Sequence, residues 1–323
     1  MTIAAYLREI GRGARGARSL DVEAAHDLMA QLLDGGLSDL EVGAFVIAMR
    51  MKGESLDELV GFLQALHERL LPLASDRPLI AIASYNGARR LPNLVPLLAL
   101  QLARAGARVL VHGPLADAQR VTTAEVFSAL GLAPAASAAA IERQWREHGC
   151  AFAPTGLLSP ALERLLAVRR TVGLRNSGHT IAKMMQPVQG APCLRLMNHT
   201  HPEFGQLMAD YAQHTRGHVG LLRGTEGEAV ADPRRGPRQR IWIDGQLQAD
   251  LSAEAEPGTL AALPELPAAV DAGTTARWIE AALAGQVAQP AALTQQTDRL
   301  LQALRRMPAA PPQPTPGRTL ESS

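Results

Sequence analysis

The amino-acid sequence predicts an α/β protein in which a small helical domain precedes a larger domain built on a mostly parallel sheet flanked by helices. Apolar side chains recur at helical spacing through roughly the first 70 residues. Farther along, short apolar runs alternate with amphipathic stretches, which is the pattern of parallel strands connected by helices. At 323 residues the chain is long enough for two domains. We expect them at residues 1–74 and 75–307, followed by a disordered, proline-rich tail at 308–323.

Helix signals are clearest in the N-terminal part. Residues 21–33 place apolar side chains three or four positions apart, and a pair of glycines follows them. Two capping boxes, in which a serine is followed three residues later by a glutamate, predict further helices that start at Ser38 and Ser55. The stretch at 11–18, which reads GRGARGAR, is expected to be a loop between helices, with a flexible basic arm for nucleic acid as the alternative.

The remainder of the chain alternates between strand and helix patterns. We expect strands at residues 79–83, 107–112, 150–153, 193–197 and 218–222, with an edge strand at 240–243 that ends in a turn at 244–245. We expect helices at residues 92–105, 122–130, 160–172, 202–214, 274–283 and 291–304.

Composition limits the class of protein. The formal net charge is only +1 at pH 7, so nucleic-acid binding would need local basic patches, and 3% aromatic residues argue against a surface that stacks bases. No apolar run is long enough for a transmembrane helix, and the charged N-terminus lacks the apolar core of a secretory signal. Cys150 and Cys193 fit a reducing cytoplasm and supply no metal framework. We therefore expect a cytoplasmic protein without a membrane anchor.

The turn after the first expected strand is the most informative segment. In α/β enzymes this position often holds a glycine-rich turn whose backbone N–H groups cradle phosphate. Here residues 84–90 read SYNGARR, with one glycine, no acid and two arginines. The backbone N–H groups of such a turn cannot approach a pyrophosphate as closely as those of a glycine-rich turn can. The side chains of Arg89 and Arg90 still attract phosphate. The turn therefore separates two hypotheses, an enzyme and a binding protein.

Several short motifs follow one another in the order found in one enzyme family. They are residues 37–39 (LSD), 48–54 (AMRMKGE), 112–113 (HG), 124–131 (AEVFSALG), 152–154 (FAP) and 168–175 (VRRTVGLR). Together they resemble the anthranilate phosphoribosyltransferase family, over most of the chain. The resemblance implies a homodimer that pairs through the helical domain. It also implies a site for phosphoribosyl pyrophosphate, magnesium and anthranilate.

Residues that carry the chemistry of that family differ in this chain. The family's diphosphate loop, a run of glycines ending in aspartate, corresponds to residues 84–88. The asparagine that follows is matched by Asn93, but the phosphate-binding serine and threonine correspond to Val95 and Pro96, which donate no side-chain hydrogen bond. Around the HG motif, the family's lysine, asparagine and arginine become Val111, Pro114 and Leu115.

The expected magnesium ligands are also replaced. The acidic pair of the family corresponds to Ala229 and Val230, whereas magnesium requires oxygen ligands that usually include one or two carboxylates. Glu226 and Glu228, just before this pair, are the carboxylates that would have to take over. Together these losses remove the pyrophosphate anchor and the charge neutralisation that its departure requires. We therefore expect no catalytic residue, no metal and no cofactor.

Basic and polar residues take the place of these groups. Residues 176–180 (NSGHT) read as a loop that opens a helix, suited to holding phosphate through backbone N–H groups and hydroxyls, and residues 234–240 carry four arginines in seven positions. The candidate phosphate-binding residues are Arg89, Arg90, Asn93, Arg169, Arg170, Arg175, Asn176, Ser177, His179, Lys183, Arg234, Arg235, Arg238 and Arg240. For Arg169 and Arg170 the alternative is retention as fold residues, and for the arginine-rich loop it is a solvated surface.

The sequence thus resembles the YbiB-type branch of the family. This resemblance implies a protein that binds nucleic acid and is not an enzyme. We expect a homodimeric, cytoplasmic protein that binds nucleic acid with little sequence specificity and favours single strands over duplex, because a flexible strand can follow a concave cleft. The main alternative is an active anthranilate-type phosphoribosyltransferase that uses phosphoribosyl pyrophosphate and magnesium. A third hypothesis is a sensor of a phosphorylated metabolite, in which the arginines hold a nucleotide without reaction.

Overall fold

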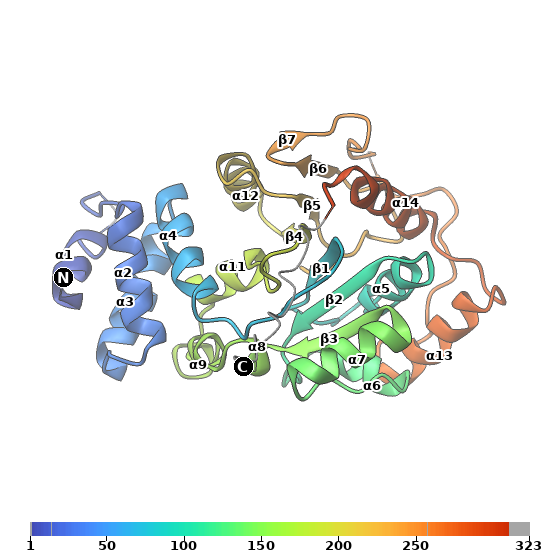
Figure 1. The fold of residues 1–323 in the computed structure, drawn as a ribbon, viewed down its shortest axis with the longest axis horizontal. Coiled ribbons are helices and arrows are strands. Elements are labelled where there is room, and N and C mark those ends of the chain that lie inside the picture. The colour runs from blue at the N-terminus through green and yellow to red at the C-terminus, as the bar shows by residue number, and fades with distance from the viewer. Residues whose placement is uncertain (1, 14, 257, 310–323) are drawn as a thin grey trace, which may run out of the picture.

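A computed structural model of the chain describes residues 2–13, 15–256 and 258–309. Within them, one seven-stranded sheet has the order β3-β2-β1-β4-β5-β6-β7 and helices cover both of its faces (Figure 1). The strands are β1 (Leu79–Ala83), β2 (Arg108–Gly113), β3 (Cys150–Pro154), β4 (Cys193–His199), β5 (Val219–Arg223), β6 (Gln239–Ile243) and β7 (Gln246–Leu247). The predicted fold class is confirmed. Most of the predicted tail, from residue 310 on, lies outside the described residues.

The first five strands are parallel, and their apolar runs are buried on both faces. Strands β6 and β7 add an antiparallel hairpin. Its turn residues Asp244 and Gly245 have φ angles of 50° and 71°, the left-handed conformation that a two-residue hairpin turn requires. The strand predicted at residues 240–243 is therefore present as β6, but the edge of the sheet is β7.

Fourteen helices occur in the described part of the chain. They are α1 (Ile3–Ile10), α2 (Val22–Leu33), α3 (Asp39–Lys52), α4 (Leu56–His67), α5 (Val95–Arg104), α6 (Thr123–Ala129), α7 (Ala138–His148), α8 (Thr155–Leu158), α9 (Pro160–Ala167), α10 (Arg169–Val172), α11 (Ser177–Met184), α12 (Pro202–His214), α13 (Ala272–Leu283) and α14 (Ala291–Arg306).

Both predicted capping boxes are present, at Ser38 and Ser55. Other helix predictions need correction. The helix predicted at 92–105 begins only at Val95, and the one predicted at 160–172 is two helices, α9 and α10. Helices α1 and α7 were not predicted from the sequence, although Ser137 caps α7 by accepting a hydrogen bond from the backbone N–H of Ala140.

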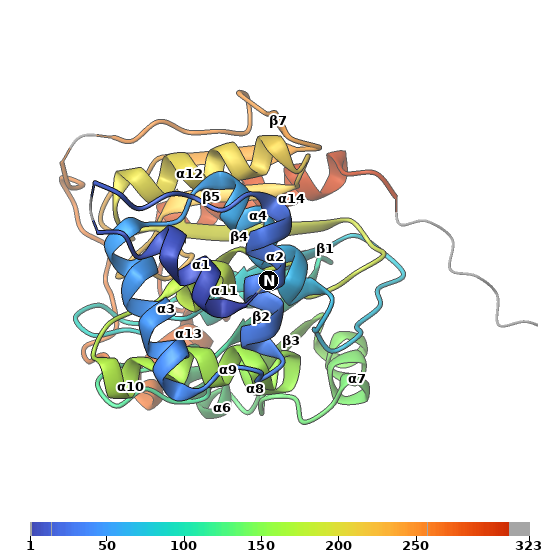
Figure 2. The same ribbon diagram turned by 90° about the vertical axis from the view of Figure 1, so that its left-hand side faces the viewer.

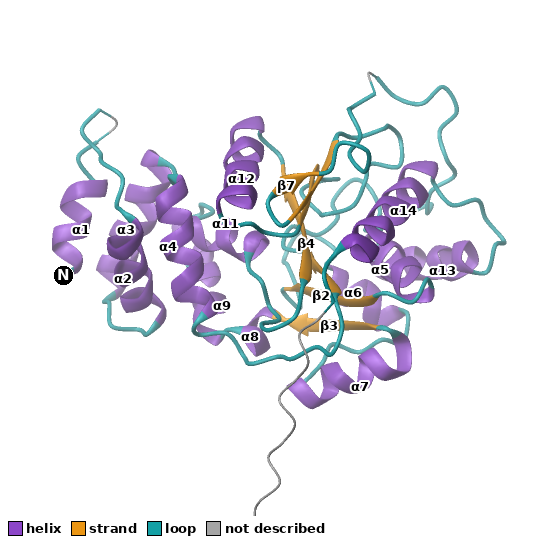
Figure 3. Ribbon diagram, turned by 45° about the horizontal axis from the view of Figure 1, so that its top comes forward, coloured by secondary structure: helices purple, strands orange, loops and turns teal. Residues whose placement is uncertain are grey.

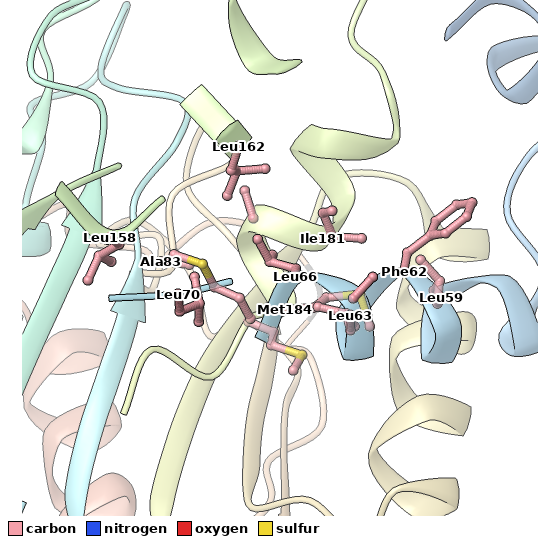
Figure 4. Packing of buried hydrophobic residues seen from close by; sticks show 14 of the residues in the cluster. Leu59, Phe62, Leu63, Leu66, Leu70, Ala83, Leu158, Leu162, Ile181 and Met184 are labelled. Atoms are coloured by element: carbon pink, nitrogen blue, oxygen red, sulfur yellow. The ribbon is translucent and has the colours of Figure 1, made fainter. Parts of the chain in front are cut away.

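The N-terminal helices form a layer that packs against one face of the sheet through α11 and α12 (Figures 1 and 2). Helix α9 contacts α2, and α11 contacts α3, α4, β1 and β4, so this helical layer is built from two separate stretches of the chain. Leu63 and Leu66 of α4, Ile181 of α11 and Ala83 of β1 belong to the same buried cluster (Figure 4). The boundary at residue 74 stays a prediction.

A second apolar cluster fills the other face of the sheet, where α5, α6, α13 and α14 pack. Figure 3 shows the strands between these helices and the helical layer. Along β4 the side chains alternate between the two clusters, with Leu194 and Leu196 in one and Cys193 and Met197 in the other. The sheet is thus a rigid platform with its carboxyl edge open toward the helical layer.

The close approach of α2 and α4 provides a test of the packing. A Cβ atom on Gly61 of α4 would lie against the carbonyl oxygen of Val22 and 2.7 Å from the backbone nitrogen of His26, which a packed pair of helices cannot accommodate without shifting. We expect Gly61→Ala to lower the free energy of unfolding by about 1–3 kcal/mol, despite the better helix propensity of alanine. Urea denaturation measures this change.

Gly273→Ala is the matched control, because the nearest atoms to its added Cβ atom would be 3.5 Å and 3.6 Å away. Its stability should stay the same or rise by up to about 1 kcal/mol. Equal effects of the two substitutions would contradict the close packing of α2 on α4.

Candidate functional site

A cleft of about 670 Å³ lies between the helical layer and the carboxyl ends of the strands. Its walls come from the C-terminal end of α3, the turn after β1, the segment from α10 into α11, the end of β4 and the start of α12. In open α/β sheets, ligands bind outside the carboxyl ends of the strands, so the cleft is at the expected place for a site. Its volume is in the range of pockets for small ligands and cofactors.

The walls of the cleft are strongly basic. Among the described residues that line it, the cationic side chains are Arg50, Arg89, Arg90, Arg120, Arg169, Arg175 and Lys183. The carboxylates are those of Glu54 and Glu226. Burial, and then repulsion by Arg169 and Arg120, lower the pKa of Arg175 to about 10. Arg169 pairs with Asp117 at 3.9 Å, but the cations of the wall still outnumber its carboxylates. An excess of positive charge raises the local concentration of anions.

Eight of the fourteen predicted site residues line this cleft, although they come from separate segments of the chain. They are Arg89, Arg90, Arg169, Arg175, Asn176, Ser177, His179 and Lys183. The other six are not among its lining residues. They are Asn93, Arg170, Arg234, Arg235, Arg238 and Arg240.

Internal partners engage most of the predicted residues outside the cleft. The side chain of Asn93 is buried, donates to Thr123 Oγ1 at 2.9 Å and accepts from the backbone N–H of Val95 at 3.2 Å. In the arginine-rich loop, Arg234 and Arg235 each pair with Asp232 at 3.0 Å, and Arg238 pairs with Glu254. Arg240 lies within β6, and Arg170 is exposed. Carboxylates of the chain therefore partly neutralise this loop.

The N-terminal end of α11 borders the cleft and is capped from within. Asn176 Oδ1 accepts from the backbone N–H of Gly178 at 2.9 Å, while its Nδ2 donates to the carbonyl oxygen of Leu165 at 2.8 Å. Burial, followed by the charges of Arg175 and Arg169, lowers the pKa of His179 to about 3. His179 is consequently neutral at pH 7, and it acts as a polar side chain and not as a cation.

Lys183 and Asn198 form the floor of the cleft. Lys183 Nζ donates to Asn198 Oδ1 at 3.1 Å and to the carbonyl oxygen of Gly227 at 3.3 Å. Burial lowers the pKa of Lys183 to about 8, although the carboxylate of Glu228 opposes that shift. Asn198 is 0% exposed and its Nδ2 has no hydrogen-bond partner in the described structure. An unpaired buried donor costs free energy, so this amide favours an acceptor in the cleft.

Sequence reasoning missed Arg50 and Arg120, although both lie near motifs that it used. Arg50 belongs to the AMRMKGE motif at the end of α3, and Arg120 shortly precedes the AEVFSALG motif. Arg120 Nη1 donates to the carbonyl oxygen of Gly87 at 3.2 Å. The signal for Arg120 was its place on the connection from β2 to α6, because that connection leaves the carboxyl end of a parallel strand beside β1.

The turn after β1, residues 84–91, already holds anions that belong to the chain. Glu228 Oε1 accepts hydrogen bonds from the backbone N–H groups of Asn86 at 2.6 Å and Gly87 at 2.5 Å. Glu226 Oε2 accepts from the backbone N–H groups of Arg89 at 2.7 Å and Arg90 at 3.0 Å. Two carboxylates thus occupy the backbone donors that would otherwise be available to a phosphate at this position.

A tight turn places both glutamates. Residues 225–228 form a two-residue reversal in which the backbone N–H of Glu228 donates to the carbonyl oxygen of Thr225 at 2.9 Å. Glu226 and Gly227 have φ angles of 52° and 86°. The left-handed conformation is costly for glutamate, by roughly 1–3 kcal/mol, and free of strain for glycine. A side chain on Gly227 would also collide with Asn86, so the two turns fit together closely.

The environments of the two carboxyl groups differ. Desolvation by burial raises the pKa of Glu228, against hydrogen bonds from Ser84, Gly87 and Asn86 that favour the carboxylate. The pKa of Glu226 is lowered overall: desolvation acts to raise it, but the backbone N–H groups of Arg89, Arg90 and Leu91 together outweigh that effect.

The residues present at this edge do not fit a magnesium ion. Ala229 and Val230 are buried and carry no oxygen ligand. The nearest carboxylates, of Glu226 and Glu228, are directed at backbone N–H groups, whereas magnesium requires several oxygen ligands in near-octahedral geometry. Within the described residues, no three histidine, cysteine or acidic side chains gather as a set that could hold a metal.

The helical layer, the mostly parallel sheet and a cleft at its carboxyl edge define a phosphoribosyltransferase-like protein. Residues 4–70 match the helical bundle domain of the glycosyl transferase family. The chain is 40% identical over 290 residues to the uncharacterized protein YbiB of Escherichia coli strain K12, and the match covers 89% of each chain. This protein belongs to the family that includes YbiB and the anthranilate phosphoribosyltransferases.

Enzymes of the family are more distant. The anthranilate phosphoribosyltransferase of Methanopyrus kandleri is 28% identical over 220 residues, which cover 68% of this chain and 62% of that enzyme. The solved structure of the Thermus thermophilus enzyme matches with a TM-score of 0.67 at 21% identity, covering 91% of this chain and 85% of that one. The Saccharomyces cerevisiae enzyme in complex with PRPP and Mg matches with a TM-score of 0.68 at 14% identity, covering 95% and 89%. These structures confirm the fold.

Within the described residues, no helix combines the length and the apolar character that crossing a lipid bilayer requires.

The contact between Glu226 and the turn makes part of the stability depend on pH. Because the pKa of Glu226 is lowered in the folded state, its contribution is present above the unfolded pKa, near pH 4.5, and is lost as the pH falls through the folded pKa. We expect Glu226→Gln to be less stable at pH 7 by about 1 kcal/mol, after discounting for solvent screening. The difference should start to shrink as the pH falls below about 4.5 and should continue to shrink as the pH falls through the folded pKa. Chemical denaturation from pH 3 to pH 7 measures it.

Glu280→Gln, on the exposed side of α13, is the control, because it removes one carboxylate away from the two turns. A difference between wild type and Glu226→Gln that stays constant across this pH range would show that the carboxylate does not hold the turn.

Proposed function

We propose that this protein binds nucleic acid with little sequence specificity through the basic cleft and does not transfer phosphoribosyl groups. The observation that carries the proposal is the pairing of Glu226 and Glu228 with the turn at 84–91. It leaves the diphosphate position filled by the chain itself, while the side chains of Arg89 and Arg90 form no ion pair among the described residues and can attract another anion. The cleft is thereby suited to phosphate that is not anchored at the turn.

Catalysis of phosphoribosyl transfer needs groups that this site does not offer. Departure of pyrophosphate develops negative charge that must be stabilised where it forms, usually by a metal ion and by preorganised donors. The donors of the turn are already bound to the side-chain oxygens of Glu228 and Glu226, and the carboxylate of Glu226 would repel a pyrophosphate. The occupied donors and the negative charge of Glu226 thus oppose the ligand that an active enzyme has to bind.

The basic side chains are arranged for an extended anion. Arg50 on α3 and Arg89 and Arg90 on the turn are exposed, whereas Arg175 and Lys183 lie deeper. Affinity from such contacts arises mainly from the release of counterions from phosphates, which is independent of sequence. Phe204 is the one phenylalanine, tyrosine or tryptophan among the described residues of the wall, so base stacking on large aromatic rings contributes little. A flexible single strand can follow this concave wall better than a duplex.

Nucleic-acid binding is tested with three arginines on the rim. Arg50, Arg89 and Arg90 have exposed side chains, so replacing all three with glutamine should leave the fold intact. We expect the triple variant to bind a labelled single-stranded oligonucleotide at least about tenfold more weakly at about 50 mM salt. The slope of log K against log salt should fall by about 2, which is roughly three single-strand phosphate contacts. Fluorescence anisotropy measures both.

The matched control replaces Arg216, Arg277 and Arg306, which lie outside the cleft, and has the same net charge. A third variant, with Arg234, Arg235 and Arg238 changed to glutamine, tests the arginine-rich loop predicted from the sequence. Unchanged binding by the rim variant would contradict the cleft as the interface. Turnover of anthranilate and phosphoribosyl pyrophosphate with magnesium would contradict the loss of catalysis. Complete displacement of the oligonucleotide by micromolar mononucleotide would favour a metabolite sensor.

We also propose that the protein forms a homodimer through α3. Leu40, Ile47 and Met51 are spaced along one side of this helix and are 83%, 41% and 72% exposed. Such a row of exposed apolar side chains on one helix is typical of a surface that pairs with another chain. A dimer would place two basic clefts on one particle, so that a single strand bound in both gains from effective concentration.

Two charged substitutions test the dimer. Leu40→Glu combined with Met51→Glu should convert a dimer into a monomer, because four like charges would meet across a two-fold interface. Light scattering coupled to size exclusion measures the mass. Leu247→Glu with Leu263→Glu, at exposed apolar positions outside α3, is the control and should leave the mass unchanged. A wild-type protein that is monomeric at micromolar concentration would contradict the pairing.

A further inference from the structure

A second, smaller pocket of about 330 Å³ lies at the opposite edge of the sheet, where β4 and β5 begin. Its walls include His67 at the end of α4, Gln186 after α11, Arg195 of β4, Tyr211 of α12 and His218 just before β5. Figure 1 shows α12 beside these strands, next to α4. None of the residues that line the basic cleft lines this pocket. The two sites are therefore separate.

Arg195 is the unusual residue of this pocket. It lies on β4 between Cys193 and Met197, whose side chains belong to the apolar cluster under the helical layer, and it is only 5% exposed. Its Nη1 donates to the carbonyl oxygen of Met184 at 3.0 Å, and its guanidinium stacks over the ring of Tyr211 at 5.5 Å. Its buried Nε has no hydrogen-bond partner within the described part of the chain. No carboxylate of the described residues forms an ion pair with it.

A buried guanidinium without a counter-charge is costly, because the charge has left water and nothing replaces its solvation. A buried lysine or glutamate can escape this cost by becoming neutral, but arginine keeps its proton in proteins. The neighbouring carbonyl oxygen and the aromatic ring supply only part of the compensation. An anion in the adjoining pocket would supply the rest.

The other polar groups of the pocket are mainly donors. His67 Nε2 accepts from the backbone N–H of Gln186 at 2.9 Å, and burial followed by the charge of Arg195 lowers the pKa of His67 to about 4. His218 Nδ1 accepts from the backbone N–H of Asp244 at 3.0 Å. Each neutral ring therefore carries its proton on the other nitrogen. The pocket is thus lined by two neutral imidazole rings that each keep one N–H, by the guanidinium of Arg195, and by Arg216, which is paired with Asp244 at 2.6 Å.

We infer that this pocket binds a small oxyanion of the phosphate type, with Arg195 as its charge partner. A tetrahedral oxyanion has acceptors on every side and matches a set of N–H donors around one positive charge. The volume lies at the low end of ligand pockets, which favours inorganic phosphate or the phosphate group of a small metabolite. The inference does not depend on the function of the basic cleft.

Isothermal titration with inorganic phosphate tests the site. The cleft is first weakened with the Arg50, Arg89 and Arg90 triple variant, which should still bind one equivalent of phosphate. Adding Arg195→Met, an uncharged side chain of similar length, should weaken that binding at least tenfold. Titration with a nucleoside monophosphate then identifies the source: tighter binding than inorganic phosphate indicates a phosphorylated metabolite, and weaker binding indicates the free anion.

Thermal unfolding separates lost binding from lost folding. Without phosphate, Arg195→Met should be no less stable than its parent, because it removes an uncompensated buried charge. With phosphate, only the parent should gain melting temperature, since the ligand stabilises the state that binds it. Gly217→Ala is a second variant, because its added Cβ atom would lie against Nη2 of Arg195 while the charge is kept. It should weaken phosphate binding at least threefold.

The inference is overturned if the triple variant, at roughly millimolar concentration, binds no phosphate when phosphate is present in about tenfold molar excess over the protein. It is also overturned if folded Arg195→Met or Gly217→Ala binds phosphate as tightly as the parent does.

Discussion

Two turns that are distant in the sequence hold each other in place, and the arrangement of the cleft depends on that contact. Backbone N–H groups of the turn at 84–91 donate hydrogen bonds to the side-chain oxygens of Glu226 and Glu228 in the turn at 225–228. Charge-assisted hydrogen bonds of this kind are about twice as strong as neutral ones. Asn86 adds a bond from its side chain to the carbonyl oxygen of Glu226 at 3.0 Å. Fixing these backbones fixes the starting points of Arg89 and Arg90.

In the contact between the two turns, the glutamates bind backbone N–H groups. The basic side chains of the cleft therefore stay close to one another. The side-chain oxygens of Glu226 and Glu228 accept hydrogen bonds from backbone N–H groups of the turn, while Glu228 also opposes the lowering of the pKa of Arg175 and Lys183. Arg175 and Lys183 remain close to other cations, and both have a lowered pKa because burial and repulsion act together. The backbone donors of the turn at 84–91 are thus satisfied within the chain, while basic side chains line the cleft beside it.

Much of the fold could be predicted because its signals are local. Helix α12 begins and ends where its sequence pattern does, with Pro202 in its first turn, and β1 is a continuous apolar run in the centre of the sheet. The contact between the two turns could not be predicted, because its partners are separated by 135 to 142 residues. Arg195 carried a signal that went unused: a charged residue within an apolar strand, at a position that faces the core.

Helix α3 is where the two surfaces of the protein meet. One side of it presents Leu40 and Met51 to solvent, and its C-terminal end supplies Met49 and Arg50 to the wall of the cleft. In a dimer paired through α3, one rigid rod would therefore be both a subunit contact and a ligand contact. Any tilt of that rod when a strand enters one cleft would be transmitted directly to the partner subunit, with no intervening loop to absorb it. Because α3 would contact both the ligand and the partner subunit, movement at one cleft of the dimer would affect the other cleft.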